Sequence, residues 1–256
     1  MFFAALILGA LTYKKLKIRQ SDYKTFFYSA LTGVSLNLGL FFIALKLTQA
    51  ILASVLVASV PIFTMLAASY YLKEKITPKL IVSSVVAFVG VVIIVGIPTN
   101  HFSTLALVGN VLLLLSSLVW VAHEIIAKKL LKVYSPEIVT FYTMAIGAAT
   151  FIPFALLELA NKPGWVFNLS FWGIFGIFYG VFLASLFAYW AWQKGLAKLP
   201  AGQASFFFYL DPISGATLSI LLLGEKLTLP LIIGSVFITA AIIIAQSHRK
   251  AHPLYK

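Results

Sequence analysis

The stretch that decides the fold is Gly202–Thr228, which reads GQASFFFYLDPISGATLSILLLGEKLT. The apolar run from Pro200 to Leu223 contains one acid, Asp211, followed directly by Pro212. At about 1.5 Å per residue, this run is long enough as a helix to cross roughly 30 Å of hydrocarbon. Asp211 is therefore predicted near the membrane midplane, where an ionised group is costly and is expected to face protein or water. Pro212 lacks a backbone N–H and is predicted to kink the helix beside the acid.

The same pattern occurs once earlier in the chain. A shift of 151 residues places Pro212 on Pro61, and the Glu-Lys-Leu-Thr of 225–228 on the Glu-Lys-Ile-Thr of 74–77. The chain is therefore predicted to contain an internal duplication. The two copies are predicted at 1–98 and 103–247, followed by a cytoplasmic tail at 248–256.

The composition indicates an integral membrane protein. The chain is 61% hydrophobic and 10% charged, values that a soluble domain of this size would not carry. The absence of cysteine excludes disulfides and thiol catalysis. The net charge of +12 comes from short basic clusters between apolar runs, so membrane topology explains it and nucleic-acid binding is not predicted.

Long apolar runs predict the membrane spans. The apolar segments lie at 1–12, 23–47, 49–72, 78–98, 104–131, 136–158, 170–197, 200–223 and 229–247. The first is too short to cross a bilayer, and the other eight are long enough. Thr77 and Thr228 are predicted to cap the helices that follow them.

The basic residues predict the orientation of these spans. Sixteen of the 19 Lys and Arg residues fall on one side when each is assigned to the nearer end of its span. The positive-inside rule makes that side cytoplasmic. We therefore expect a multi-pass protein of the cell (inner) membrane with a cytoplasmic C-terminus. Glu74 and Glu225 then lie on opposite faces, which requires two inverted repeats with an odd number of spans, five in each copy.

The chain resembles the drug/metabolite transporter superfamily, in particular its EamA-type permeases. Leu45–Thr77 and Leu196–Thr228 carry the resemblance. It implies an all-α fold of ten helices in two inverted repeats, with both termini cytoplasmic. It also implies a central cavity for small metabolites such as amino acids, often exported. By the internal register the first copy would begin about 48 residues before Met1, so this chain lacks the first helix and part of the second.

One polar stripe is predicted on the segment 104–131. Asn110, Ser117, Glu124 and Lys128 fall within about 40° of one another at 100° per residue. The stripe is interpreted as a cavity wall. The alternative is that Glu124 merely pairs with Lys128 one turn away. His123 lies about 100° off the stripe, where a packed, hydrogen-bonded histidine is favoured.

A second polar arc is predicted on the segment 200–223, made of Gln203, Asp211, Ser214 and Thr217. Asp211 is interpreted as a proton-coupling carboxylate or as an anchor for an ammonium group. The alternative is a purely architectural acid bonded to the backbone that Pro212 loosens.

The remaining candidates are single residues. Asn37 lies mid-span, while Trp190 and Tyr209 belong to an aromatic cluster that fits either an interfacial belt or a substrate vestibule. The hinge candidates are Pro61 and Pro212. Glu74 and Glu225 are expected to stabilise the helices that follow them, because a negative charge interacts favourably with the positive end of the helix dipole.

The predicted function is secondary transport of a small metabolite by alternating access, with export expected. The expected partners are a small-molecule substrate, protons and the lipid bilayer; the oligomeric state is undetermined. The sequence contains no HExxH motif, paired aspartate motif or ATP site, so no enzyme activity, catalytic residue, metal or cofactor is predicted. A scaffold or non-transporting truncated paralogue is the main alternative, and an intramembrane enzyme is a weaker one.

Overall fold

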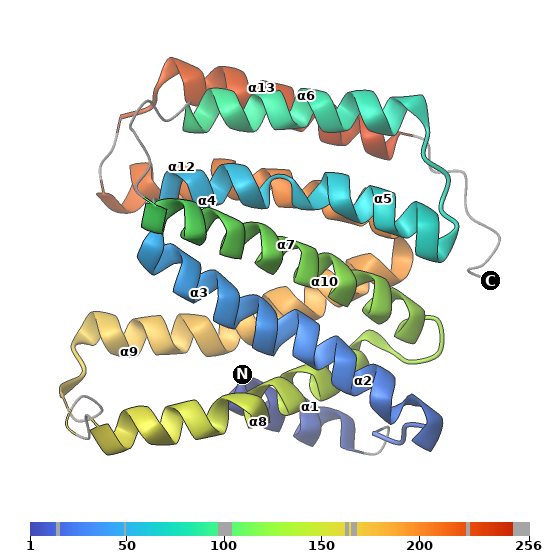
Figure 1. Cartoon of the computed structure of the whole chain (residues 1–256), viewed down its shortest axis with the longest axis vertical. Helices are drawn as coiled ribbons and strands as arrows, with labels where there is room; N and C mark the ends of the chain where they lie inside the picture. The colour runs from blue at the N-terminus through green and yellow to red at the C-terminus, as the bar shows by residue number, and fades with distance from the viewer. Residues whose placement is uncertain are drawn as a thin grey trace. The chain divides into compact units, whose positions relative to one another are not determined.

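The computed structural model describes residues 1–13, 16–48, 50–96, 104–161, 164, 168–223 and 226–247. Every regular element in these ranges is helical, which confirms the all-α class (Figure 1). The elements are α1 (Phe2–Thr12), η2 (Gln20–Asp22), α2 (Tyr23–Ala30), η3 (Leu31–Leu36), α3 (Asn37–Leu47), α4 (Ala50–Val57), α5 (Val60–Leu72), α6 (Pro78–Val95), α7 (Thr104–Leu130), α8 (Pro136–Asn161), α9 (Phe171–Phe178), η5 (Tyr179–Ala188), α10 (Tyr189–Lys198), α11 (Ala201–Ala204), η6 (Ser205–Leu210), α12 (Asp211–Leu223) and α13 (Leu229–Gln246). Glu225 and the predicted tail 248–256 lie outside the described residues.

Among the described residues, seven helical segments are long and apolar enough to cross a membrane. They are Gln20–Leu47, Ala53–Leu72, Pro78–Val95, Thr104–Leu130, Pro136–Asn161, Phe171–Lys198 and Leu229–Gln246. The predicted span 200–223 is not one of them. It divides into α11, the 3₁₀ segment η6 and α12.

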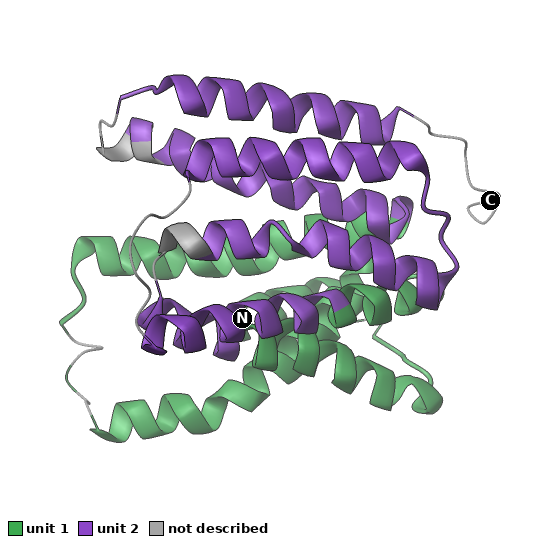
Figure 2. Cartoon of the chain, turned by 45° about the horizontal axis from the view of Figure 1, so that its top comes forward, with its two compact units in different colours: residues 1–38, 122–197 green, residues 39–121, 198–256 purple. Residues whose placement is uncertain are grey.

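The chain forms two compact units (Figure 2). Unit 1 comprises residues 1–38 and 122–197, and unit 2 comprises residues 39–121 and 198–256. These units differ from the predicted copies at 1–98 and 103–247, because a compact unit reflects packing whereas a copy reflects sequence similarity. The two copies remain a prediction.

Unit 1 is built around α8. Helices α1 and α2 and the π-helical segment η3 pack against it. Gly147 of α8 allows the closest approach, because a Cβ built there would lie 2.4 Å from Cγ1 of Val34 in η3. The Phe26 ring of α2 packs against Tyr134 and Tyr142, with ring centroids 5.1 and 5.0 Å away. Small and aromatic residues therefore fix the core of this unit.

Unit 2 is built around the pair α6 and α13, which lie side by side (Figure 1). The predicted caps are confirmed: Thr77 Oγ1 accepts the Leu80 N–H at 3.2 Å, and Thr228 Oγ1 accepts the Leu231 N–H at 3.4 Å. Lys79, at the start of α6, donates to Ser247, which follows the end of α13. The two helices are therefore antiparallel, the relation expected if one copy is inverted with respect to the other.

A second contact in unit 2 joins α5 to α11. After α5 ends, the Glu74 carboxylate accepts the backbone N–H of Ala201 at 2.7 Å and that of Gly202 at 3.1 Å. Glu74 therefore caps the start of α11, where a negative charge is stabilising. The sequence-based expectation had assigned Glu74 to the start of the next helix along the chain, and the structure assigns it to another helix instead.

The two hinge prolines stand at breaks between helices. Pro61 is the second residue of α5 and Pro212 the second residue of α12, rather than lying inside continuous helices. The Phe208 carbonyl, which Pro212 cannot bond, accepts the N–H of Asp211 through a 3₁₀ bond. The predicted mid-helix kink at Pro212 is therefore a change from 3₁₀ to α winding just before the proline.

Candidate functional site

His123 lies at the centre of a buried polar group in unit 1. Its side chain is fully buried, and its Nδ1 is 2.8 Å from the carbonyl oxygen of Ser29 and 3.1 Å from the Ser29 hydroxyl. A carbonyl oxygen can only accept a hydrogen bond, so Nδ1 is the nitrogen that carries the proton. The histidine therefore adopts the Nδ1–H tautomer, and its Nε2 is an acceptor.

Two side chains of α10 meet that acceptor. The Tyr189 hydroxyl lies 2.8 Å from Nε2, and the Gln193 side-chain nitrogen lies 3.3 Å from it. Both groups carry hydrogens that Nε2 can accept. The neutral imidazole is thus bonded on both sides, to α2 through Ser29 and to α10 through Tyr189 and Gln193.

The Gln193 side-chain amide is hydrogen-bonded through its nitrogen but not through its oxygen. Its side chain is fully buried, and its Oε1 has no hydrogen-bond partner among the described residues. A buried acceptor of this kind costs about 1–3 kcal/mol. A buried polar atom without a partner in a native structure calls for an explanation, and a functional role is one.

Two π-helical segments flank the histidine. Gly33 of η3 contacts the ring so closely that a Cβ there would lie 2.4 Å from Nδ1. Tyr189 follows directly after η5. By the 151-residue shift, η3 (31–36) corresponds to 182–187, which lies inside η5 (179–188). The same irregular winding therefore occurs at matching positions of both predicted copies, and π-helical turns are frequent at functional sites.

Two charged residues of α7 complete this group. Glu124 is fully buried and Lys128 nearly so. The Lys128 ammonium donates to the Leu196 carbonyl at 2.6 Å and to the Ala197 carbonyl at 3.4 Å, so it binds the end of α10, where a cation is favoured. Glu124 follows His123 directly in α7. We call the set Ser29, His123, Glu124, Lys128, Tyr189 and Gln193 the His123 cluster.

The other predicted residues of unit 1 lie elsewhere. Trp190 is partly buried and donates its indole N–H to Glu137 at 3.0 Å. The Lys194 ammonium lies 4.0 Å from the centroid of the same ring, a cation–π contact. Asn37 is partly buried and follows η3 directly.

Three predicted residues of unit 2 are bonded to neighbouring segments. Asn110 accepts a hydrogen bond from Thr48 at 2.6 Å. Tyr209 is fully buried and donates to the Ser84 carbonyl at 3.3 Å. The backbone carbonyl of Gln203 accepts from Gln246 at 3.0 Å. These contacts join helices of unit 2, as interhelical polar bonds do in membrane proteins.

The exposed arc on α12 contains Asp211, Ser214 and Thr217. Ser214 and Thr217 donate to backbone carbonyls of the same helix, those of Asp211 and Ile213. The predicted grouping of Gln203 with these residues is wrong. Six residues of 3₁₀ winding separate Gln203 from Asp211, and at about 120° instead of 100° each they add about 120° of rotation.

The stripe predicted on α7 lies along one helix, and its role as a cavity wall stays a prediction. α7 is a continuous helix, and Ser117, Glu124 and Lys128 are all buried along it. The Ser117 hydroxyl has no hydrogen-bond partner among the described residues. The prediction therefore identified Glu124 and Lys128 of the His123 cluster.

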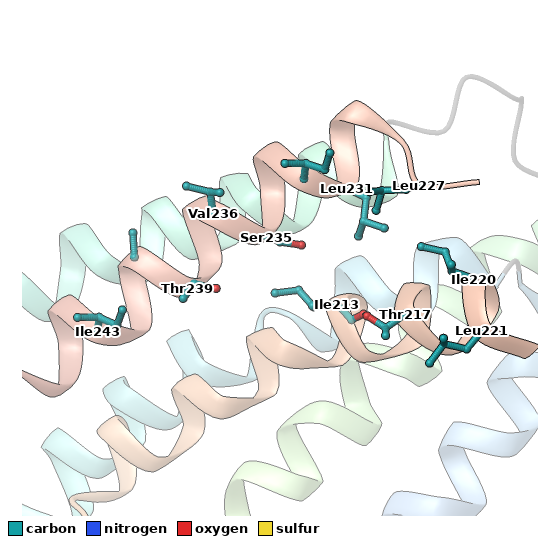
Figure 3. A pocket seen from close by; sticks show the side chains of 12 residues that line it. Ile213, Thr217, Ile220, Leu221, Leu227, Leu231, Ser235, Val236, Thr239 and Ile243 are labelled. Atoms are coloured by element: carbon teal, nitrogen blue, oxygen red, sulfur yellow. The ribbon is translucent and has the colours of Figure 1, made fainter. Parts of the chain in front are cut away.

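A groove of about 680 Å³ lies between α12 and α13 in unit 2 (Figure 3). Ile213, Leu221, Leu231 and Ile243 contribute apolar lining, and Thr217, Ser235 and Thr239 contribute hydroxyls. In the described part of the chain, no three His, Asp or Glu residues are grouped so that they could hold a metal ion.

Long apolar helices with charged groups buried among them define a polytopic membrane protein with a polar interior, the class to which channels and transporters belong. The sequence profile of the EamA-like transporter family matches residues 1–96 and 107–246. The chain belongs to this family.

Relatives support the same assignment. An uncharacterized transporter of Archaeoglobus fulgidus is 30% identical over 223 residues, which cover 86% of this chain and 75% of that protein. An uncharacterized transporter of Clostridium kluyveri is 29% identical over 250 residues, covering 95% and 78%. A solved crystal structure superimposes with a TM-score of 0.77 at 15% identity, covering 98% of this chain and 87% of that one, and this shows the fold.

Proposed function

We propose that this chain is a secondary transporter that exports a small organic solute, such as an amino-acid-like metabolite, across the cytoplasmic membrane. The observation that carries the proposal is the His123 cluster, which keeps a glutamate and a lysine buried inside a helical unit. Buried charges are expensive in a membrane and are typical of solute or ion pathways. Membership of a transporter family supports the same conclusion.

Alternating access is the mechanism that we infer. The breaks before Pro61 and Pro212 occupy matching positions of the two predicted copies. Short interruptions of this kind let two helical segments change their angle without unwinding either one. Rocking about these two breaks would expose a solute site first to one side of the membrane and then to the other.

Asp211 and Glu124 are the proposed charged groups along the pathway. Asp211 is exposed on α12 and Glu124 is buried on α7, so they suit different tasks. We propose that Asp211 meets an ammonium group of a solute, whereas Glu124 balances a positive charge inside unit 1. We expect protons to be the coupling ion.

The test is solute flux in proteoliposomes that contain the purified chain. A panel of labelled amino acids and related metabolites is loaded inside, and efflux is followed with and without a proton gradient. We expect at least one solute to leave faster than from empty liposomes. Asp211→Asn should reduce this flux at least tenfold, while Glu158→Gln, an exposed acid on α8, should leave it unchanged.

Two outcomes would contradict the proposal. If no solute in the panel moves faster than in empty liposomes, the transporter proposal fails and a scaffold role is favoured. If Asp211→Asn keeps full flux with an unchanged dependence on the proton gradient, Asp211 has no part in coupling.

A further inference from the structure

We propose that His123 is the group that binds the coupling proton, and that rotation of the Gln193 amide is the switch by which the protein accommodates the protonated ring. This inference rests on the proposed function, and it assigns the coupling proton to a residue other than the two carboxylates. It is carried by the hydrogen-bond geometry around His123.

In the neutral state, the ring has one donor and one acceptor. Nδ1–H donates to the Ser29 carbonyl at 2.8 Å. Nε2 accepts from Tyr189 at 2.8 Å and from Gln193 at 3.3 Å. These hydrogen bonds are compatible with neutral imidazole, and the Gln193 oxygen has no hydrogen-bond partner among the described residues.

Adding a proton at Nε2 turns this nitrogen from a hydrogen-bond acceptor into a donor, while Nδ1 stays a donor. An imidazolium has two donors and no acceptor, so the amide hydrogens of Gln193 would point at the new N–H. A half-turn of the Gln193 amide removes this conflict, because it brings Oε1 to the position that the nitrogen held. The oxygen that has no partner in the neutral state thereby accepts a hydrogen bond from the new Nε2–H.

Tyr189 changes its role at the same time. Its oxygen then accepts a hydrogen bond from Nε2–H, and its own O–H turns away from the ring to donate to another acceptor. The bond to Ser29 is unchanged, because Nδ1 carries a proton in both states.

The groups packed against the ring come from α2, η3 and α10. Tyr189 of α10 is the titratable group bonded to Nε2, and Ser29 of α2 and Gly33 of η3 add none. Lys128, one turn along α7, binds the Leu196 and Ala197 carbonyls. The lysine charge is therefore taken up by the end of α10.

The switch is joined to both π-helical segments. Gly33 in η3 lies against the ring, and Tyr189 follows η5 directly. A change in the hydrogen bonds at Nε2 therefore acts on α10 where its winding changes from π to α. Such a segment can shift by a small step, so the charge of His123 would bias which of two arrangements unit 1 adopts.

The test reads the histidine directly by ¹⁵N NMR on the full chain in lipid nanodiscs, with labelled histidine. The four histidines are distinguished by comparing the wild-type protein with His123→Gln. At alkaline pH we expect a neutral ring with its proton on Nδ1, and on acidification an imidazolium signal. Gln193→Leu, which has no oxygen to offer, should move this conversion to lower pH by about one to two units.

A flux measurement separates the failure of this inference from failure of the proposed function. With a transported solute, His123→Gln should retain downhill efflux but lose its acceleration by a proton gradient, and Gln193→Leu should shift the pH profile in the same direction as the NMR conversion. A His123 ring that carries its proton on Nε2, or that stays neutral until the protein unfolds, overturns the inference whatever the flux. A ring that titrates in a chain without flux overturns the proposed function and leaves the proton site standing.

Discussion

The backbones of Gly90 and Gly234 touch where α6 crosses α13. A Cβ built on Gly90 would lie 2.8 Å from the Gly234 carbonyl oxygen, and one built on Gly234 would lie 2.5 Å from the Gly90 carbonyl oxygen. Contacts of this length do not occur between a real Cβ and a carbonyl. The approach of these two helices therefore depends on the absence of a side chain at both positions, as in other small-residue crossings in membranes.

Replacing either glycine by alanine should destabilise unit 2. We expect Gly90→Ala and Gly234→Ala each to cost about 1–3 kcal/mol of unfolding free energy, because the helices must separate to admit the methyl group. Thermal unfolding in detergent measures the effect. Gly215→Ala is the matched control, since a Cβ there meets nothing within 4 Å, and a loss of stability in this control equal to that of Gly90→Ala would disprove the packing argument.

Removing the charge of Glu74 should loosen the start of α11. The carboxylate accepts two backbone N–H groups, those of Ala201 and Gly202, and charge-assisted bonds of this kind are roughly twice as strong as neutral ones. We expect Glu74→Gln to cost about 1 kcal/mol. Hydrogen exchange of the Ala201 and Gly202 amides, compared with Glu158→Gln, reads the local effect. Unchanged exchange at both amides would show that the cap contributes nothing.

Tyr134 should make the stability of unit 1 depend on pH in the alkaline range. Its hydroxyl donates to Asp22 at 2.5 Å and accepts the Arg19 N–H at 3.0 Å. Loss of solvation, and then the bond to Asp22, raise the pKa of Tyr134 above its ordinary value of 10.0. The folded protein therefore holds this proton more tightly than the unfolded chain does, so the stabilisation is complete below pH 10 and is lost as the pH rises toward the folded pKa.

The check is the difference in unfolding temperature between the wild-type protein and Tyr134→Phe from pH 8 to pH 11. We expect a constant difference up to about pH 9 and a shrinking one above it, because only the wild-type protein loses the contribution. A difference that grows above pH 10 would contradict the assigned direction of the shift.

The inverted arrangement of the two copies predicts opposite labelling at matching positions. Lys75 and Lys226 are related by the 151-residue shift, and the chain contains no cysteine, so single-cysteine variants report one position each. We expect an impermeant maleimide applied to intact cells to label Lys226→Cys and not Lys75→Cys, with the reverse in inside-out vesicles. Labelling of both from one side would disprove the inversion.

The parts of the fold that follow from local chemistry could be predicted from the sequence. Thr77 and Thr228 cap helices as expected, because a threonine hydroxyl satisfies a backbone N–H two or three residues away. The buried face of α7 was also predictable, because that helix is continuous and a regular rotation of 100° per residue holds along it.

The parts that depend on irregular winding or on contacts between distant segments could not be predicted. The predicted arc that grouped Gln203 with Asp211 assumed 100° per residue. It fails because η6 winds more tightly than an α-helix. Glu74 meets α11 across 127 residues of sequence, and Ser29 meets His123 across 94. No periodicity within one segment indicates such partners. His123 is packed and hydrogen-bonded, as expected, but its partners on α2 and α10 were not predicted.

The π-helical segments η3 and η5 have a consequence for protein engineering. Each contains at least one residue more than regular winding would use over the same path. Deleting the extra residue of η5 should restore regular winding and leave the helix beyond it close to its present length and orientation. Tyr189 would then stay beside His123, so a one-codon deletion removes the π-helical winding without any foreign side chain entering the protein.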